Sequence, residues 1–328
     1  MNTPLPMPVS VVLCTYNGER WLPELWRSLL AQTHVPDEIV VRDDASSDGT
    51  FALLENLRGA ALARGVRVTL ARNERNLGFV GNFEAALADA TGAIVFLCDQ
   101  DDIWHPQKIA LMLAQFERRP GLLLLHSDAR LVDEAGIDMH CGLFEALEVT
   151  RRERALIHSG RAFDALLRRN LATGATLAFR RSLLKDVAPF PPEWVHDEWL
   201  AIIAAAIGEV DCLEQPLIDY RQHGGNQIGA QWRGVGKSLE RAGQPRQPYL
   251  SGLIARTQVL LARAPAFRFR EARRRALQRK LAHLRWRASM PACRPCRLPA
   301  VLLEAARGGY ARYARGMRAV AYDLFGRN

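Results

Sequence analysis

Residues 93–102 read AIVFLCDQDD, an unbroken apolar run followed by three carboxylates within four positions. The apolar part, 93–98, is rich in branched residues and predicts a buried strand of a parallel sheet. Three neighbouring carboxylates repel one another, so folding tolerates them best where a cation offsets their charge. The stretch therefore predicts a strand with a polar site at its carboxyl end. A solvated acidic turn before a helix near His105 is the structural alternative.

The residues before this stretch alternate between strand and helix patterns. Strands are predicted over 9–14, 38–41 and 66–71. Helices, with apolar residues at helical spacing, are predicted over 19–32, 51–64 and 81–90. This alternation predicts an α/β fold with a mostly parallel sheet and helices on both faces. Such sheets bind ligands at the carboxyl ends of their strands, where the polar clusters 15–18, 43–48 and 99–102 fall.

Composition and charge divide the chain into two parts. Of its 328 residues 48% are hydrophobic and 24% charged, which excludes disordered, collagen-like and disulfide-scaffold classes. The net charge is +9, but the segment from Gln231 to Asn328 holds 22 basic and only 4 acidic residues. We therefore predict one domain over 1–229 and a basic helical extension over 230–328. Within the extension, helices are predicted over 235–288 and 299–325, separated by Pro, Cys and Arg residues at 291–298.

Targeting signals and cysteine chemistry are weak in this sequence. Residues 1–8 lack the basic and apolar regions of a signal peptide, and no run of 18 apolar residues occurs. We therefore expect a cytoplasmic protein. The pair Cys293-Arg-Pro-Cys296 has neither a second pair for zinc nor a βαβ context for redox chemistry, so we interpret it as incidental.

Four motifs follow one another in the first hundred residues. They are SVVLCTYN at 10–17, VRDDASSDGT at 41–50, NLGFVGN at 76–82 and FLCDQDD at 96–102. Their succession resembles the family 2 glycosyltransferases, which have the GT-A fold, and the resemblance extends from residue 9 to about 228. It implies a nucleoside-diphosphate sugar donor and a divalent cation, Mg²⁺ or Mn²⁺. Carboxylate oxygens are ligands that both ions accept.

The resemblance also implies roles for individual residues. It assigns donor binding to Thr15, Tyr16, Asn17, Glu19, Asp43, Asp44, Asn76, Gly78, Asn82 and Asp99. It assigns the cation to Asp101. Asp48 and Ser46 are explained equally well by a turn into the next helix. Ala45 stands where the family usually has glycine or a small residue, so a left-handed backbone at this position is in doubt.

Three downstream segments resemble the family members that build bacterial polysaccharides, often with L-rhamnose from a dTDP donor. They are TGAT at 173–176, HDEW at 196–199 and YRQHGGNQIG at 220–229. The resemblance implies that Asp197 is the catalytic base and that His223 is a second metal or diphosphate ligand. Further donor or acceptor candidates are Asp102, Trp104, Thr173, Gly174, His196, Glu198, Trp199, Arg221 and Asn226.

Each of these assignments has a structural alternative. Asp197 could cap a helix over 198–208, and His223 could be a turn residue before two glycines. Arg221 could pair with an acidic neighbour, and Trp104 and Trp199 could be core residues.

The chemistry of inverting glycosyl transfer needs these parts. A carboxylate takes the proton of the acceptor hydroxyl, and a cation absorbs the charge of the departing diphosphate. The resemblance implies transfer from dTDP-L-rhamnose, or alternatively a UDP-hexose, to a saccharide or lipid-linked acceptor in surface polysaccharide or O-antigen synthesis. A metal-dependent phosphoryl- or nucleotidyl-transfer enzyme is the alternative from another class.

The basic extension suggests a membrane partner. Residues 267–287 interleave nine basic side chains with apolar ones, which is typical of a helix on anionic lipid, and residues 310–325 repeat the pattern with arginines and aromatic side chains. We therefore expect peripheral association with the inner face of the cell membrane. The alternatives are packing on the catalytic domain and binding of nucleic acid. We expect no nucleic-acid partner, because the extension contains no recognised module for one.

Overall fold

The computed structural model describes residues 7–224, 245–267 and 269–326. Its chain forms two compact units, one of which ends at Gly160 and resumes at Ala172. The other joins the segment Arg161–Leu171 to the C-terminal helices. The sequence prediction placed this segment in the first domain. It belongs with the helices because Lys280 donates a hydrogen bond to the Leu167 carbonyl and Phe163 meets Phe269 edge to face.

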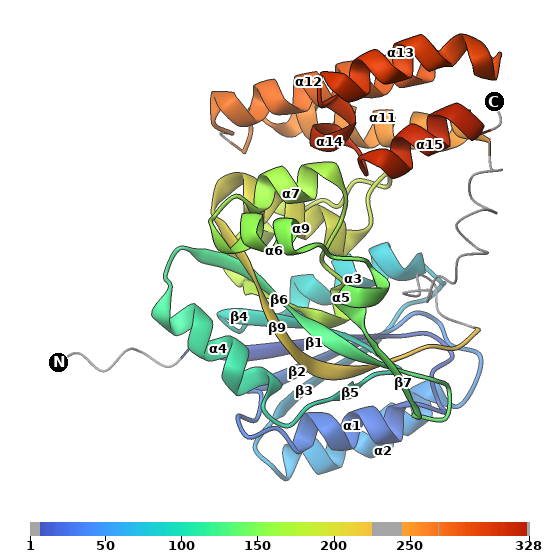
Figure 1. The fold of residues 1–328 in the computed structure, drawn as a ribbon. Helices are drawn as coiled ribbons and strands as arrows, with labels where there is room; N and C mark the ends of the chain where they lie inside the picture. The colour runs from blue at the N-terminus through green and yellow to red at the C-terminus, as the bar shows by residue number, and fades with distance from the viewer. Residues whose placement is uncertain (1–6, 225–244, 268, 327–328) are drawn as a thin grey trace. The chain divides into compact units, whose positions relative to one another are not determined.

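Four parallel strands form the first half of a nine-stranded sheet, in the spatial order β3-β2-β1-β4 (Figure 1). They are β1 (Val9–Thr15), β2 (Glu38–Asp43), β3 (Arg67–Arg72) and β4 (Ile94–Asp99). The helices that connect them are α1 (Leu22–Leu30), α2 (Thr50–Leu62) and α3 (Gly78–Asp89). The predicted α/β class and the four predicted strands are therefore confirmed.

The register of these strands brings their polar ends to one edge. Thr15 of β1 lies opposite Asp43 of β2, and Cys14 lies opposite Asp99 of β4. Strands β1, β2 and β4 are buried on both faces, with α1 and α2 on one side of the sheet and α3 on the other (Figure 1), whereas β3 at the sheet edge is partly exposed. Burial of each such Val, Leu or Ile side chain contributes roughly 1.5–3 kcal/mol, which fixes the sheet that carries the loops.

The second half of the sheet is mixed. It consists of β8 (Leu177–Arg180), β6 (Leu122–Val132), β9 (Glu209–Arg221) and β5 (Ile103–Trp104), with β7 (Asp138–Gly142) paired to β6. The long strand β9 pairs with β5, where Ile103 lies opposite Asp219. Because β5 directly follows the loop after β4, this pairing brings the end of β9 next to that loop. The residues that follow β9 therefore lie beside it.

Further helices complete the sheet unit. They are α4 (Lys108–Arg118), α5 (Leu143–Ala146), α6 (Arg151–His158), η2 (Arg181–Leu183), α8 (Leu184–Val187) and α9 (His196–Ile207). The segment Gly174–Thr176 is a single 3₁₀ turn, η1, directly before β8.

The second unit is helical. Its elements are α7 (Ala162–Arg168), α11 (Arg246–Arg263), α12 (Glu271–Ala288), α13 (Arg294–Ala306), α14 (Gly309–Tyr313) and α15 (Met317–Phe325). The predicted helical extension is confirmed for the described residues, and α13 starts earlier than the predicted 299. No helix among the described residues is both long and apolar enough to span a bilayer.

Buried ions hold this unit together. Asp323 of α15 is fully buried and receives hydrogen bonds from Arg246, Arg287 and Tyr310. These partners come from α11, α12 and α14, so one carboxylate ties four helices.

Candidate active site

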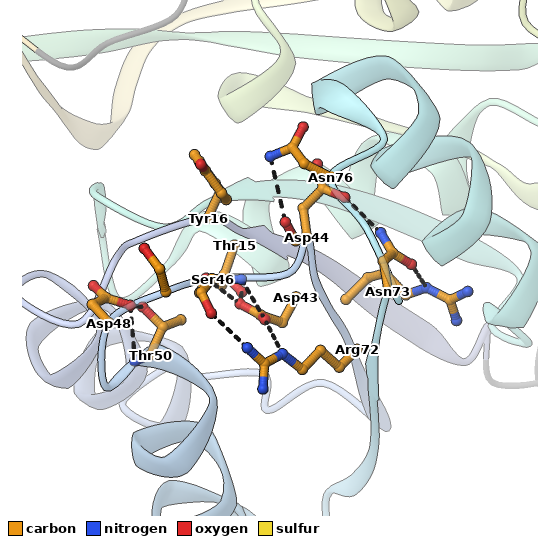
Figure 2. Close-up of polar contacts among 12 residues, drawn as sticks. Thr15, Tyr16, Asp43, Asp44, Ser46, Asp48, Thr50, Arg72, Asn73 and Asn76 are labelled. Carbon is orange, nitrogen blue, oxygen red and sulfur yellow. Dashed lines mark hydrogen bonds and ion pairs between the residues drawn. The ribbon is translucent and has the colours of Figure 1, made fainter.

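Three loops at the carboxyl edge of the sheet are joined by side-chain hydrogen bonds. Thr15 donates to the Asp43 carboxylate at 3.0 Å, and the Ser46 amide donates to the same carboxylate at 3.1 Å (Figure 2). Arg72 at the end of β3 lies 3.4 Å from Asp43. Asp43 is completely buried, so these contacts offset the cost of removing its charge from water. They also fix the loops after β1 and β2 relative to each other.

Asp44 organises the start of α3. Its carboxylate accepts hydrogen bonds from the amides of Leu77 and Gly78 at 2.8 and 2.9 Å and from Asn73 at 2.7 Å. Asn73 also donates to Asn82, which is buried on α3. A carboxylate at the amino end of a helix interacts favourably with the helix dipole. Asp44 and Asn82 therefore have a structural role here, and their direct contact with a donor stays a prediction.

Backbone conformation in these loops corrects one sequence interpretation. Ala45 has a φ of 59° and Asn17 a φ of 50°, both in the left-handed region. The doubt about a left-handed residue at 45 was therefore wrong. The position needs this conformation because Asp44 must turn toward α3 while Ser46 turns back to Asp43. An alanine in this region is disfavoured by roughly 1–2 kcal/mol.

Gln100 is a positioning residue that sequence reasoning missed. Its side-chain oxygen accepts from the Tyr16 amide at 2.8 Å, and its side-chain nitrogen donates to the Tyr16 carbonyl at 3.0 Å. This paired bond links the loop after β1 to the loop after β4 and leaves the Tyr16 ring exposed. Glu19 makes a similar link, accepting from the Gly49 amide at 3.0 Å. The middle position of a DxD motif carries no sequence signal for such a role.

The structure brings two of the predicted metal ligands together across 122 residues. The Asp101 carboxylate lies 2.8 Å from Nε2 of His223, and both side chains are largely buried. His223 stacks on Trp21 with ring centroids 5.1 Å apart. A carboxylate and an imidazole nitrogen at this distance could share a divalent cation, since both are metal ligands. The oxygen and nitrogen ligands present thus fit the ion that the motif implies.

Arg221 lies beside the Asp101–His223 pair and bonds to the acidic loop. Its backbone amide donates to Asp102 at 3.2 Å, and its guanidinium donates to the Asp101 carbonyl at 3.0 Å and to Glu24 at 2.7 Å. The side chain is buried, so Arg221 anchors the end of β9 to the acidic loop. The structural alternative of pairing with an acidic neighbour therefore describes Arg221 correctly. Among the described residues, the second carboxylate oxygen of Asp102 has no hydrogen-bond partner.

Electrostatics show how closely the carboxylates gather. Burial, and then the charges of Asp101 and Asp197, raise the pKa of Asp99 to about 7. Burial and the same acidic loop raise the pKa of Asp102 well above its usual value. The charge of Asp197 on α9 is one of the causes of this rise, although about a hundred residues separate it from Asp99 in the sequence.

A buried lysine under this loop was also missed. Lys108, the first residue of α4, is completely buried and donates to the Ala175 carbonyl at 2.7 Å. Its ammonium lies 3.6 Å from the centre of the Trp104 ring. Burial lowers the pKa of Lys108 to about 7, while Cys98, Asp102 and Asp99 act in the opposite direction. Lys108 is therefore a buried amine that interacts with the acidic loop and carries its charge at a cost.

The predicted base lies in the first turn of α9. Asp197 accepts a hydrogen bond from the Gly174 amide at 2.9 Å through one oxygen and from the Glu198 amide at 2.6 Å through the other. The helix cap is Val195, so Asp197 is not the cap residue. A Cβ at position 174 would lie 3.3 Å from Nε2 of His196 and at ordinary contact distance, 3.6 Å, from the Asp197 carboxylate. The backbone amide of Gly174 thus orients the carboxylate.

Burial corrects three aromatic candidates. Trp199 is fully buried and donates to the Val187 carbonyl at 2.9 Å. Trp104 is buried between Phe96 and Lys108. Neither ring is available to a sugar, because apolar packing covers both. His196 stacks on Phe83, and burial lowers its pKa to about 3, so it is a neutral core residue.

Other candidates keep their predicted status. Thr173 supplies the carbonyl that closes the 3₁₀ turn before β8. Glu198 follows Asp197 on α9 and is partly buried. Asn226 lies outside the described residues.

The fold defines the class of protein. A mostly parallel sheet that presents carboxylates at its strand ends, extended by antiparallel strands, is the GT-A architecture. The sequence profile of glycosyl transferase family 2 matches residues 10–187. This match covers more than half of the chain, and the chain belongs to that family.

Relatives and a solved structure agree with this assignment. An uncharacterized glycosyltransferase of Nostoc sp. is 29% identical over 231 residues, which are 67% of this chain and 66% of that protein. The Escherichia coli UDP-Glc:alpha-D-GlcNAc-diphosphoundecaprenol beta-1,3-glucosyltransferase is 27% identical over 60% of this chain and 69% of its own length. The mannosyltransferase of Pyrobaculum calidifontis in complex with GDP-Man and Mn²⁺ superimposes with a TM-score of 0.53 at 20% identity, covering 98% of this chain and 86% of that one. This chain thus matches just under two thirds of the Nostoc protein's length.

Proposed function

We propose that this protein is an inverting glycosyltransferase that uses Asp197 as general base and a divalent cation held by Asp101 and His223. The observation that carries the proposal is the convergence of these groups from three distant segments. Asp101 meets His223 at 2.8 Å, and the Asp197 charge contributes to the raised pKa of Asp99. A base carboxylate beside a metal–diphosphate site is the minimum arrangement for transfer by inversion.

The transfer step follows from this arrangement. The acceptor hydroxyl attacks the anomeric carbon of the donor while the bond from that carbon to the diphosphate oxygen breaks. Asp197 accepts the hydroxyl proton, and the nucleoside diphosphate leaves with the bonding electron pair. The cation would absorb the negative charge that develops on the diphosphate. The hydrogen bonds from the Gly174 and Glu198 amides hold the Asp197 carboxylate in a fixed orientation.

The donor is proposed from two sources. The motifs after residue 173 favour dTDP-L-rhamnose, through their resemblance to polysaccharide-building members of the family. The name of the Escherichia coli relative favours UDP-glucose and supports the alternative of a UDP-hexose donor. In either case the nucleobase of the donor would lie near Thr15 and Tyr16. The exposed ring of Tyr16 offers it a stacking surface.

The acceptor is proposed to be a saccharide or a lipid-linked saccharide of bacterial surface polysaccharide synthesis, such as O-antigen. The same relative's name specifies a lipid-diphosphate acceptor, which supports this class. A lipid-linked acceptor places the reaction at a membrane. We therefore also propose a cytoplasmic protein, peripheral on the inner face of the cell membrane.

Calorimetric titration of the full chain with dTDP, UDP, GDP and CDP, with and without Mg²⁺ or Mn²⁺, tests the donor site. We expect metal-dependent binding of dTDP or UDP that Asp101→Ala abolishes and His223→Ala weakens. Asp89→Ala is the matched control, because Asp89 is a surface acid paired with Arg42 at the far end of α3. Binding of none of the four nucleotides, or binding unchanged in Asp101→Ala, would overturn the assignment. Release of inorganic phosphate without sugar transfer would favour the phosphoryl-transfer alternative.

A further inference from the structure

The surface of the last three helices has an unusual composition. Every exposed side chain between Pro291 and Phe325 is apolar, a cysteine or an arginine. The two carboxylates of the segment point inward, since Glu304 pairs with His283 at 2.8 Å and Asp323 is fully buried. The exposed surface of this segment therefore carries positive charge and apolar groups, with no acidic residue among them.

Large apolar side chains stand out from this surface. Their exposed fractions are 46% for Leu298, 56% for Leu302, 53% for Leu303, 76% for Met317 and 63% for Phe325. Isolated exposed leucines are ordinary, but a concentration of them marks an interaction surface.

Helix α13 shows the arrangement most clearly. Pro295, Leu298, Leu302 and Ala306 are spaced three or four residues apart and are all exposed, so they form one outward stripe. Arg294 and Arg307 are exposed near the two ends of this stripe. The opposite face of α13, with Val301, packs in the core of the helical unit. Figure 1 shows α13 along the outer margin of that unit.

Helix α12, which lies in the predicted lipid-binding segment 267–287, does not expose its apolar face. In α12 the apolar residues Leu277, Leu281 and Leu284 are buried within the helical unit. That apolar face is therefore used for folding and is not available to lipid. The expectation that residues 267–287 offer an amphipathic lipid face is corrected, and the exposed apolar groups lie on α13 and α15 instead.

We propose that the exposed surface of α13–α15, referred to below as the arginine–leucine surface, docks in the plane of a bilayer that contains anionic phospholipid. Exposed leucines would enter the acyl boundary while the arginines meet the headgroup phosphates. A second copy of this chain is a poorer occupant, because two such surfaces would oppose arginine with arginine. This inference deepens the proposed membrane attachment and rests on that part of the proposed function.

Vesicle flotation with the full chain tests the proposal. Wild-type protein is expected to float with vesicles of phosphatidylglycerol and phosphatidylethanolamine and not with phosphatidylcholine alone. Leu302→Glu is expected to lose flotation. Leu62→Glu is the matched control, because Leu62 has a similar exposed fraction, 51%, but lies at the end of α2 in the other unit. Changing Arg307 and Arg318 together to Gln is expected to weaken binding about thirtyfold, or about fivefold for each arginine. Arg151 and Arg152, exposed on α6, provide the control pair.

The possible outcomes separate this proposal from the enzymatic one. Equal flotation of Leu302→Glu and Leu62→Glu, or no flotation of wild type, would overturn docking through this surface. Sedimentation equilibrium that shows a wild-type dimer and a Leu302→Glu monomer would assign the surface to self-association instead. Metal-dependent nucleotide binding is measured on the same proteins. If Leu302→Glu retains the helical circular dichroism and the thermal unfolding of wild type, the loss of flotation is not a folding defect of the helical unit, and if every variant lacks nucleotide binding, the donor assignment fails separately.

Discussion

The buried ammonium of Lys108 makes a quantitative prediction about stability. Its pKa is about 7 in the folded chain, compared with 10.5 for an exposed lysine. The unfolded chain therefore binds more protons between pH 7 and 10.5, so this group makes stability rise with pH in that window. A pKa shift of one unit corresponds to about 1.4 kcal/mol. The shift of Lys108 therefore lowers the free energy of unfolding by roughly 4 kcal/mol at pH 7.5 and by roughly 2 kcal/mol at pH 9.

Replacing Lys108 with methionine removes this cost and keeps an unbranched apolar side chain over Trp104. The variant loses the hydrogen bond to Ala175, which costs about 1–3 kcal/mol. We expect the free energy of unfolding of Lys108→Met to exceed that of wild type by roughly 1–3 kcal/mol at pH 7.5. At pH 9 the variant should lose about 2 kcal/mol of this advantage, because wild type becomes more stable as the pH rises.

Urea unfolding followed by tryptophan fluorescence at both pH values measures the difference, and titrating groups that do not interact with Lys108 cancel between the two proteins. Lys185→Met, at an exposed position on α8, is the matched control and should change neither value. A Lys108→Met variant that is less stable by the same amount at both pH values would refute the reasoning, because the ammonium would then be a net stabilising group.

Three further predictions concern other parts of the fold. Ala45→Gly should raise the free energy of unfolding by roughly 1 kcal/mol in urea titrations, since glycine adopts the left-handed conformation without strain. Asp323→Ala should destabilise the helical unit by about 3–5 kcal/mol in the same assay, because it leaves buried arginines unpaired, whereas Asp164→Ala at a surface pair should cost at most about 1 kcal/mol. Gln100→Leu should accelerate hydrogen exchange of the Tyr16 amide while the exchange of β1 amides stays slow, and an unchanged rate at Tyr16 would contradict the paired bond.

The strands and their polar ends follow from sequence because each apolar run stops at a run of polar residues. The meeting of Asp101 and His223 was expected only through the family resemblance. In the structure it results from the pairing of β5 with β9. That pairing is a long-range event, which local periodicity does not encode.

Other features of the site were hidden for physical reasons. A lysine at the start of an amphipathic helix usually lies in solvent, so nothing marks Lys108 as buried. The sequence beside an acidic motif does not show whether a tryptophan ring faces a sugar or the core. Here Trp104 and Trp199 face the core. The stripe on α12 and the stripe on α13 are both amphipathic in sequence. Only the packing of the helical unit decides which of them faces outward.

The role of Asp197 is the most direct test of the account. Asp197→Asn keeps the size of the side chain and can still accept the hydrogen bond from Gly174, but it cannot take a proton. The account predicts that sugar transfer falls by about 10²–10⁴-fold while metal-dependent nucleotide binding, measured by calorimetry, is retained. Transfer at the wild-type rate, or loss of nucleotide binding together with transfer, would contradict Asp197 as the base.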